Sequence, residues 1–166
     1  MGMSGDAVIG PVTSAADLAA VADLMRAYAG WIGIDLGFQG FEAELASLPG
    51  KYAPPTGALL LARSADGRAV GCVALRALAE AGCCEMKRLY ILPEGRGHGL
   101  GRRLAEAIID EARRLGYREM RLDTLPSMQG ALAIYRGLGF VEAAPYYQTP
   151  IAETVFLWLD LGTSEA

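Results

Sequence analysis

The sequence contains little histidine or cysteine, and these shortages exclude several kinds of site. Its 166 residues include one histidine, His98, and three cysteines, Cys72, Cys83 and Cys84. One histidine cannot build a zinc site of several histidines, and the cysteines lack the spacing of metal ligands. We therefore expect no metal site, and we predict that the cysteines are buried thiols in a reducing compartment.

Long apolar runs and an excess of positive charge are also missing. The longest apolar runs, such as residues 155–159, are strand-sized, whereas a membrane-spanning helix needs about 20 apolar residues. The net charge is -4, from 15 basic and 19 acidic residues, which argues against a nucleic-acid partner. Residues 1–6 have neither a basic region nor an apolar stretch, which predicts no signal peptide and a cytoplasmic location.

The composition is that of a soluble globular protein, with 52% hydrophobic and 20% charged residues. The length predicts a single domain, spanning residues 7–161. Apolar periodicity and turn residues predict helices that start after the N-cap Ser14 and end at Gly30, and over 41–48, 100–115 and 130–138. They predict strands over 7–13, 57–64, 69–78, 83–92, 119–125, 140–144 and 154–161.

This order of elements predicts an α/β fold, a mixed β-sheet flanked by helices on both faces. The three strands between residues 57 and 92 form an antiparallel meander, because Asp66-Gly67 and Ala81-Gly82 are turn signals. The strand from Cys83, the helix from Leu100 and the strand from Glu119 form a β-α-β unit. Its two strands should therefore run parallel with a right-handed crossover.

The glycine-rich turn that opens the helix from Leu100 is the most informative segment. A strand ends at Pro93, and Gly97, Gly99 and Gly101 follow directly. Unpaired amides and the peptide dipoles at a helix start attract anions, and glycine lets a phosphate approach the backbone. The segment is neither a Rossmann fingerprint nor a Walker A loop, since both spacings fail.

The pattern Arg-x-x-Gly-x-Gly, from Arg96 to Gly101, resembles the pyrophosphate-binding signature of the GCN5-related N-acetyltransferase (GNAT) superfamily. The strand before it ends in proline, and residues 131–140, Ala-Leu-Ala-Ile-Tyr-Arg-Gly-Leu-Gly-Phe, are similar to the family's second conserved helix and the strand that follows. The resemblance covers about residues 7–161 and is strongest over about residues 85–141. It implies the GNAT-like acyl-CoA N-acyltransferase fold, with acetyl-CoA as co-substrate.

The resemblance implies that two central strands splay apart and that the arm of acetyl-CoA lies in the gap. The strand before the loop would then bind the arm and polarise the thioester carbonyl through backbone groups of Leu89, Tyr90 and Ile91. The pyrophosphate would lie on the amides of the loop and helix start, at Arg96, Gly97, His98, Gly99, Leu100, Gly101 and Arg102. His98 has a second reading as an exposed, incidental residue.

One position departs from the family's pattern. Members often carry an asparagine seven residues before the conserved tyrosine, where it binds the CoA arm. This chain has Met128 there, with Ser127 beside it. Ser127 is therefore either a CoA contact or the N-cap of the following helix.

The resemblance further implies an N-acetyltransferase in which an amine attacks the thioester directly in a ternary complex. Tyr135 matches the general acid, with packing against Phe140 as the alternative. Glu85 resembles the glutamate base, and the strand period places it on the same face as Leu89. An ion pair, for which Lys87 on that face is a partner, is the alternative for Glu85.

The resemblance also implies a small-molecule or peptide amine as the acceptor. Tyr146, Tyr147, Trp31, Phe38 and Phe41 lie where the family usually builds the acceptor pocket, with plain packing as the alternative. A homodimer is also open, because family members are often dimers. A non-catalytic acyl-CoA-binding sensor of the same fold is the alternative function.

Overall fold

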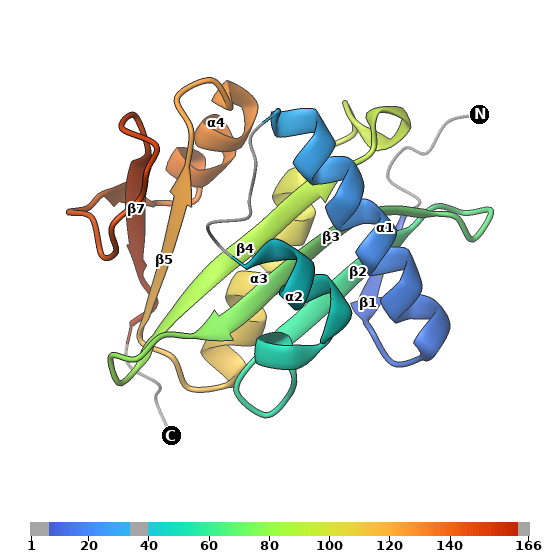
Figure 1. The fold of residues 1–166 in the computed structure, drawn as a ribbon, viewed down its shortest axis with the longest axis horizontal. Helices are drawn as coiled ribbons and strands as arrows, with labels where there is room; N and C mark the ends of the chain where they lie inside the picture. The colour runs from blue at the N-terminus through green and yellow to red at the C-terminus, as the bar shows by residue number, and fades with distance from the viewer. Residues whose placement is uncertain (1–6, 34–39, 163–166) are drawn as a thin grey trace.

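The computed structural model describes residues 7–33 and 40–162. Its strands form one mixed seven-stranded sheet in the order β1-β2-β3-β4-β5-β7-β6 (Figure 1). The elements follow the predicted sequence of strands and helices: β1 Val8–Pro11, α1 Ala15–Ile32, α2 Phe41–Ala46, η2 Gly50–Tyr52, β2 Ala58–Arg63, β3 Ala69–Ala77, β4 Cys83–Ile91, η3 Pro93–Gly95, α3 Leu100–Arg114, β5 Glu119–Thr124, α4 Gln129–Gly137, β6 Val141–Glu142 and β7 Val155–Asp160.

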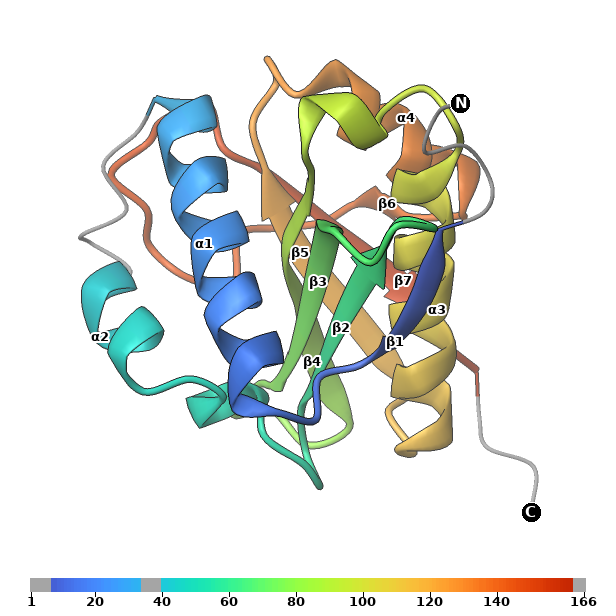
Figure 2. The same ribbon diagram turned by 90° about the vertical axis from the view of Figure 1, so that its right-hand side faces the viewer.

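Helices cover both faces of the sheet, as predicted. Figure 2 shows α1 and α2 on one side and α3 on the other. Buried residues of α1 and α2, including Val21, Leu24 and Leu45, pack in one apolar cluster with the sheet. Residues of α3 and α4, including Leu104 and Leu132, belong to a second cluster on the opposite face. The sheet thus separates two cores, and side chains of its central strands reach both.

The first helix is longer than the sequence predicts. Ser14 caps it as expected, since its hydroxyl oxygen accepts a hydrogen bond from the Asp17 amide at 3.0 Å. The prediction that Gly30 ends the helix is wrong, because α1 continues to Ile32. A glycine inside a helix costs only about 1 kcal/mol, and the left-handed backbone that ends this helix belongs to Gly33, at φ 69°.

A β-bulge interrupts β4 beside the expected site. Cys72 of β3 pairs with Tyr90, but Ala74 pairs with Lys87, so the bulge lies between those two residues of β4. Arg88 within it has a left-handed φ of 61°. The extra residue shifts the alternation of side chains.

The shift corrects one prediction about faces. Cys84 and Met86 pack in the α3-side cluster, so Glu85 between them faces the α1 and α2 side. Leu89 packs against the α3-side cluster. Glu85 and Leu89 therefore lie on opposite faces, and the strand period alone placed them wrongly together.

The two parallel strands β4 and β5 pair over only three residue pairs, Cys83–Glu85 with Glu119–Arg121. Beyond Glu85, β4 pairs with β3 alone, while β5 pairs with β7 as far as Thr124. The strands therefore part in the middle of the sheet. This splay leaves unpaired backbone at the centre of the fold.

The remaining differences lie at the ends of elements. The strand predicted over 140–144 shortens to β6, Val141–Glu142. Cys72, Cys83 and Cys84 are buried thiols, as predicted. No helix in the described residues has both the length and the apolar character needed to cross a membrane.

Candidate active site

A groove of about 420 Å³ lies where the glycine-rich loop meets the end of β4 and the start of α4. We call it the loop groove. Every predicted cofactor-binding residue except His98 lines it; the lining comprises Leu89, Tyr90, Ile91, Arg96, Gly97, Gly99, Leu100, Gly101, Arg102 and Ser127, together with Trp31, Met128, Gln129, Gly130, Ala131 and Ile134. His98 is exposed and not among them.

Backbone amides gather at this groove. In the described residues, no backbone acceptor is recorded for the amides of residues 97–102, the loop and the first turn of α3. The first residues of α4 also line the groove, so two helix N-termini face one space. Gly97 and Gly99 have φ values of 87° and 73°, and a Cβ on either would project into open space. The local chemistry suits an anion that needs close backbone approach.

The arginines at the groove already have partners within the chain. The Arg96 Nε donates to the Ile91 carbonyl at 2.9 Å, and its guanidinium stacks 4.8 Å from the centre of the Trp31 ring. Arg102 pairs with Glu106 at 3.2 Å, and both side chains are about half exposed. Arg96 therefore packs on the groove wall, whereas Arg102 remains at its open rim.

Ser127 does not cap α4. Met128 occupies the N-cap position and makes no side-chain capping bond, so the capping alternative for Ser127 is wrong. Ser127 instead lines the loop groove, and the other role that the sequence left open, a contact to CoA, stays a prediction.

A second, much smaller cavity, of about 50 Å³, lies in the splay between β4 and β5; we call it the splay cavity. It shares Leu89 and Met128 with the loop groove, so the two spaces adjoin. The remaining lining residues come from α1, β4, β5, α4 and the segment before β7: Tyr28, Ile32, Met86, Lys87, Arg88, Asp123, Thr124, Leu125, Tyr135, Ile151 and Thr154.

Tyr135 reaches the splay cavity from α4. It also packs edge-on against Phe140, with ring centres 5.7 Å apart. Burial, together with the negative charge of Asp123 and the nearby Tyr28, raises the pKa of the Tyr135 phenol well above its usual value. The phenol therefore stays protonated at neutral pH. Tyr135 packs on Phe140 and also lines the splay cavity, so the packing does not exclude a position at the site.

Glu85 sits in an ion pair, as one of the two alternatives predicted, but its partner is Arg76. Its Oε1 lies 2.6 Å from the Arg76 Nε, and its Oε2 accepts a hydrogen bond from the Tyr146 hydroxyl at 2.6 Å. Burial raises the pKa of Glu85, but the charge of Lys87 and the bonds to Tyr146 and Arg76 outweigh it, so the pKa lies below its usual value. Glu85 does not line the splay cavity.

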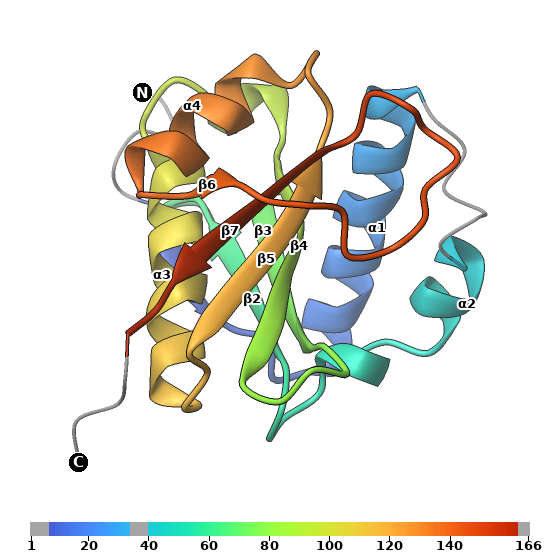
Figure 3. The same ribbon diagram turned by 90° about the vertical axis from the view of Figure 1, so that its left-hand side faces the viewer.

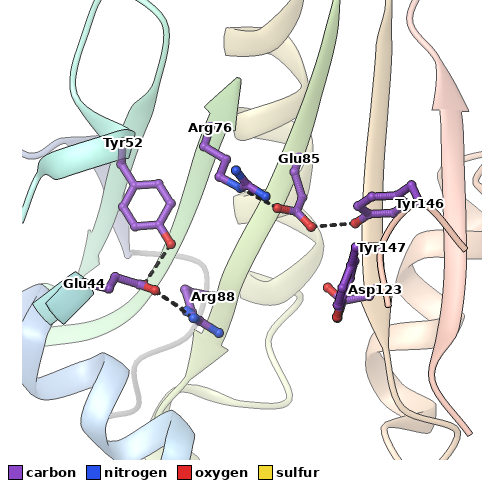
Figure 4. A network of polar contacts seen from close by, with 8 residues as sticks. All are labelled: Glu44, Tyr52, Arg76, Glu85, Arg88, Asp123, Tyr146 and Tyr147. Atoms are coloured by element: carbon purple, nitrogen blue, oxygen red, sulfur yellow. Dashed lines mark hydrogen bonds and ion pairs between the residues drawn. The ribbon is translucent and has the colours of Figure 1, made fainter. Parts of the chain in front are cut away.

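The structure also contains polar contacts that the sequence analysis missed (Figure 4). Glu44 of α2 binds Arg88 through both oxygens, at 2.8 and 3.0 Å, and accepts a hydrogen bond from Tyr52 at 2.8 Å. Burial raises the pKa of Glu44, but Arg88 and Tyr52 outweigh it and lower the pKa. This buried network fixes the bulged residue of β4 beside the splay.

Asp123 of β5 was also missed. It lines the splay cavity, and its Oδ2 accepts a hydrogen bond from the Tyr147 hydroxyl at 2.5 Å. A sequence signal did exist, because Asp123 is an acidic residue near the end of a strand predicted to be central and parallel. Ligands commonly bind at the carboxyl ends of such strands.

The described aromatic residues expected near the acceptor lie in three places. Tyr146 and Tyr147 pack on Phe156, with ring centres 5.3 Å away in each case. They belong to the segment between β6 and β7, which crosses toward α1 in Figure 3. Phe41 is buried under the Arg88 guanidinium at 5.3 Å, whereas Trp31 lines the loop groove. Phe38 lies outside the described residues.

Comparison with known proteins agrees with this geometry. The family model described as the acetyltransferase (GNAT) family matches residues 22–140. An uncharacterized N-acetyltransferase of Schizosaccharomyces pombe is 44% identical over 139 residues, which covers 84% of this chain and 85% of that protein.

Solved structures share the fold at lower identity. A GNAT-family acetyltransferase from Staphylococcus aureus has a TM-score of 0.78 at 18% identity, covering 93% of this chain and 99% of that one. A phosphinothricin acetyltransferase from Sinorhizobium meliloti, solved with acetyl-CoA, has a TM-score of 0.71 at 18% identity, covering 95% and 89%. The chain belongs to the acetyltransferase (GNAT) family and is an acetyl-CoA-dependent acyltransferase.

Proposed function

We propose that this chain is an N-acetyltransferase that binds the phosphate end of acetyl-CoA in the loop groove, receives its thioester end at the splay cavity, and lets an amine attack the thioester directly there. The observation that carries the proposal is that the two spaces adjoin at Leu89 and Met128. A ligand held by its phosphates at the loop could then present its far end beside Tyr135. The amine nitrogen would meet the thioester at that cavity while the phosphate end stays in the loop groove, as a ternary complex requires.

The residues of the loop groove fit the phosphate end of acetyl-CoA. The amides of residues 97–102 have no recorded backbone acceptor in the described chain, and anions bind such helix starts. Gly101 has a further role, because a Cβ there would lie 3.1 Å from the Ile134 side chain. The glycine therefore lets α3 and α4 approach each other at the groove.

Acetyl-CoA, when bound, would supply an acetyl thioester: a neutral amine forms the N–C bond, the C–S bond breaks, the nitrogen loses one proton and the sulfur gains one. We assign the donation of the proton to sulfur to the Tyr135 hydroxyl, which is restored by the proton that the nitrogen loses. A phenol with the ordinary pKa of about 10 is protonated at neutral pH, as a general acid must be; burial raises the pKa of Tyr135 further and so makes it a weaker acid. A backbone N–H in the Leu89–Ile91 segment would polarise the acetyl carbonyl, since Leu89 lies where the two spaces meet.

Glu85 suits the structural alternative better than the role of base. Both of its oxygens are occupied, its side chain is 1% exposed, and its pKa is lowered. A carboxylate with a lowered pKa is a weak proton acceptor. We therefore propose that Glu85 positions Arg76 and Tyr146 and touches neither substrate.

The test is a steady-state assay of thiol release, with acetyl-CoA and a panel of primary amines varied together. A ternary complex predicts thiol release that requires the amine, and reciprocal plots that intersect. Parallel plots would indicate a covalent acetyl-enzyme and contradict direct attack. Binding of acetyl-CoA without turnover of any amine would favour the acyl-CoA sensor.

A further inference from the structure

The network in Figure 4 contains three carboxylates, which differ in whether one or both of their oxygens accept a hydrogen bond. Glu44 uses both oxygens for Arg88, and Glu85 uses one for Arg76 and one for Tyr146. Asp123 uses only Oδ2, for Tyr147. Within the described residues, Oδ1 of Asp123 has no recorded hydrogen-bond donor.

Asp123 is also the carboxylate that faces the acceptor space. It lines the splay cavity, whereas Glu44 and Glu85 do not. Tyr147 holds it from the segment between β6 and β7, and Tyr147 itself packs on Phe156 at 5.3 Å. The orientation of the carboxylate is therefore fixed by a side chain that is itself packed in place.

We infer that Asp123 binds the acceptor as a cationic primary amine, with Oδ1 receiving a hydrogen bond from the ammonium group. This inference rests on the proposed function, because it places the amine beside the thioester end of the loop groove. At neutral pH a primary amine is almost entirely protonated, since its pKa is about 10. A partly buried carboxylate with an available oxygen is the usual partner for such a cation.

The rest of the splay cavity indicates which part of the acceptor lies next to the amine. Arg88 faces the cavity, but Glu44 neutralises it, and Lys87 lies near the charges of Glu85 and Asp123. Much of the remaining wall is apolar or aromatic: Tyr28, Ile32, Met86, Leu125, Met128, Tyr135 and Ile151. The cavity measures only about 50 Å³, so the part of the acceptor that fits inside it is a primary amine on a short apolar stem.

The test compares 2-phenylethylamine with 2-phenylethanol, which keeps the body but carries no charge. Binding of each is measured by calorimetry to the full chain saturated with CoA, which cannot acetylate. The wild-type protein should bind the amine about tenfold or more tightly than the alcohol, as expected for a charge-assisted bond. Asp123→Asn should remove most of that preference, and its unfolding midpoint shows whether it is folded.

Asp110→Asn is the matched control, because it makes the same change on an exposed part of α3. It should keep the wild-type preference. A preference that survives Asp123→Asn would overturn the inference, and so would a CoA-bound wild-type protein that does not prefer the amine. Failure to bind CoA at all would instead contradict the proposed function, so the two failures are distinguishable.

Discussion

Replacing Glu44 by glutamine tests how strongly its buried ion pair with Arg88 stabilises the fold. The two side chains bond through two contacts, at 2.8 and 3.0 Å, and their side-chain exposures are 5% and 3%. Glutamine keeps the size of Glu44 and removes its charge. Arg88 would then remain buried at the bulge without a counter-charge.

The expected loss is large because water cannot replace the missing charge. Removing one partner of a buried pair costs about 3–5 kcal/mol of unfolding free energy. A domain of this size loses about 2–4 °C of midpoint per kcal/mol. The unfolding midpoint of Glu44→Gln should therefore fall by about 6–20 °C.

Thermal unfolding gives the midpoint and urea unfolding gives the free energy, both followed by circular dichroism, with wild type, Glu44→Gln and Glu106→Gln in parallel. Glu106 pairs with Arg102 at 3.2 Å, but both side chains are about half exposed. Exposed pairs contribute about 0–1 kcal/mol, so this control should change little. A loss below about 1 kcal/mol in Glu44→Gln, or equal losses in both variants, would refute the reasoning.

Three further predictions concern the site and its charges. Tyr135→Phe should lower kcat by about 10²-fold and leave CoA affinity unchanged by calorimetry, because Tyr135 lines the splay cavity and not the loop groove; unchanged turnover would remove the hydroxyl from the reaction. Gly130→Glu should abolish CoA binding, because a Cβ there meets open space in the groove and the added charge repels phosphate, whereas Gly30→Glu, equally open on exposed α1, should bind normally. The pKa of Glu85 lies below its ordinary 4.5, so the stability that its charge contributes is complete above about pH 4.5 and is lost as the pH falls through the folded-state pKa. Urea titrations at several pH values should therefore show a smaller loss of stability in acid for Glu85→Gln than for wild type, and an unchanged pH profile would contradict this.

Local sequence predicted what local physics determines. The order of strands and helices and the loop from Arg96 to Gly101 follow from periodicity and glycine spacing. The expected gathering of Leu89 and the loop glycines at one groove occurs. The single domain, the homodimer, the cytoplasmic location and the roles of the site residues stay predictions.

The features that the sequence analysis missed depend on contacts between residues that are far apart in the chain. Arg88 takes a left-handed backbone conformation, and its partner Glu44 lies 44 residues earlier. No local sequence pattern predicts such a bulge. Without it, the alternation of side chains along the strand places Glu85 and Leu89 on one face. Asp123 likewise can be recognised as a candidate site residue only in the folded chain, where β5 separates from β4 and Tyr147 donates a hydrogen bond to it.

The most direct test of the central claim is thermal unfolding with acetyl-CoA, CoA, NADH and ATP in parallel. A ligand at about 100 times its Kd stabilises the folded state by about 2.7 kcal/mol, which corresponds to about 5–11 °C in a domain of this size. Acetyl-CoA and CoA should raise the midpoint by that amount, while NADH and ATP leave it unchanged. No shift with acetyl-CoA or CoA, or an equal shift with all four ligands, would contradict the assignment of the loop groove as the acetyl-CoA site.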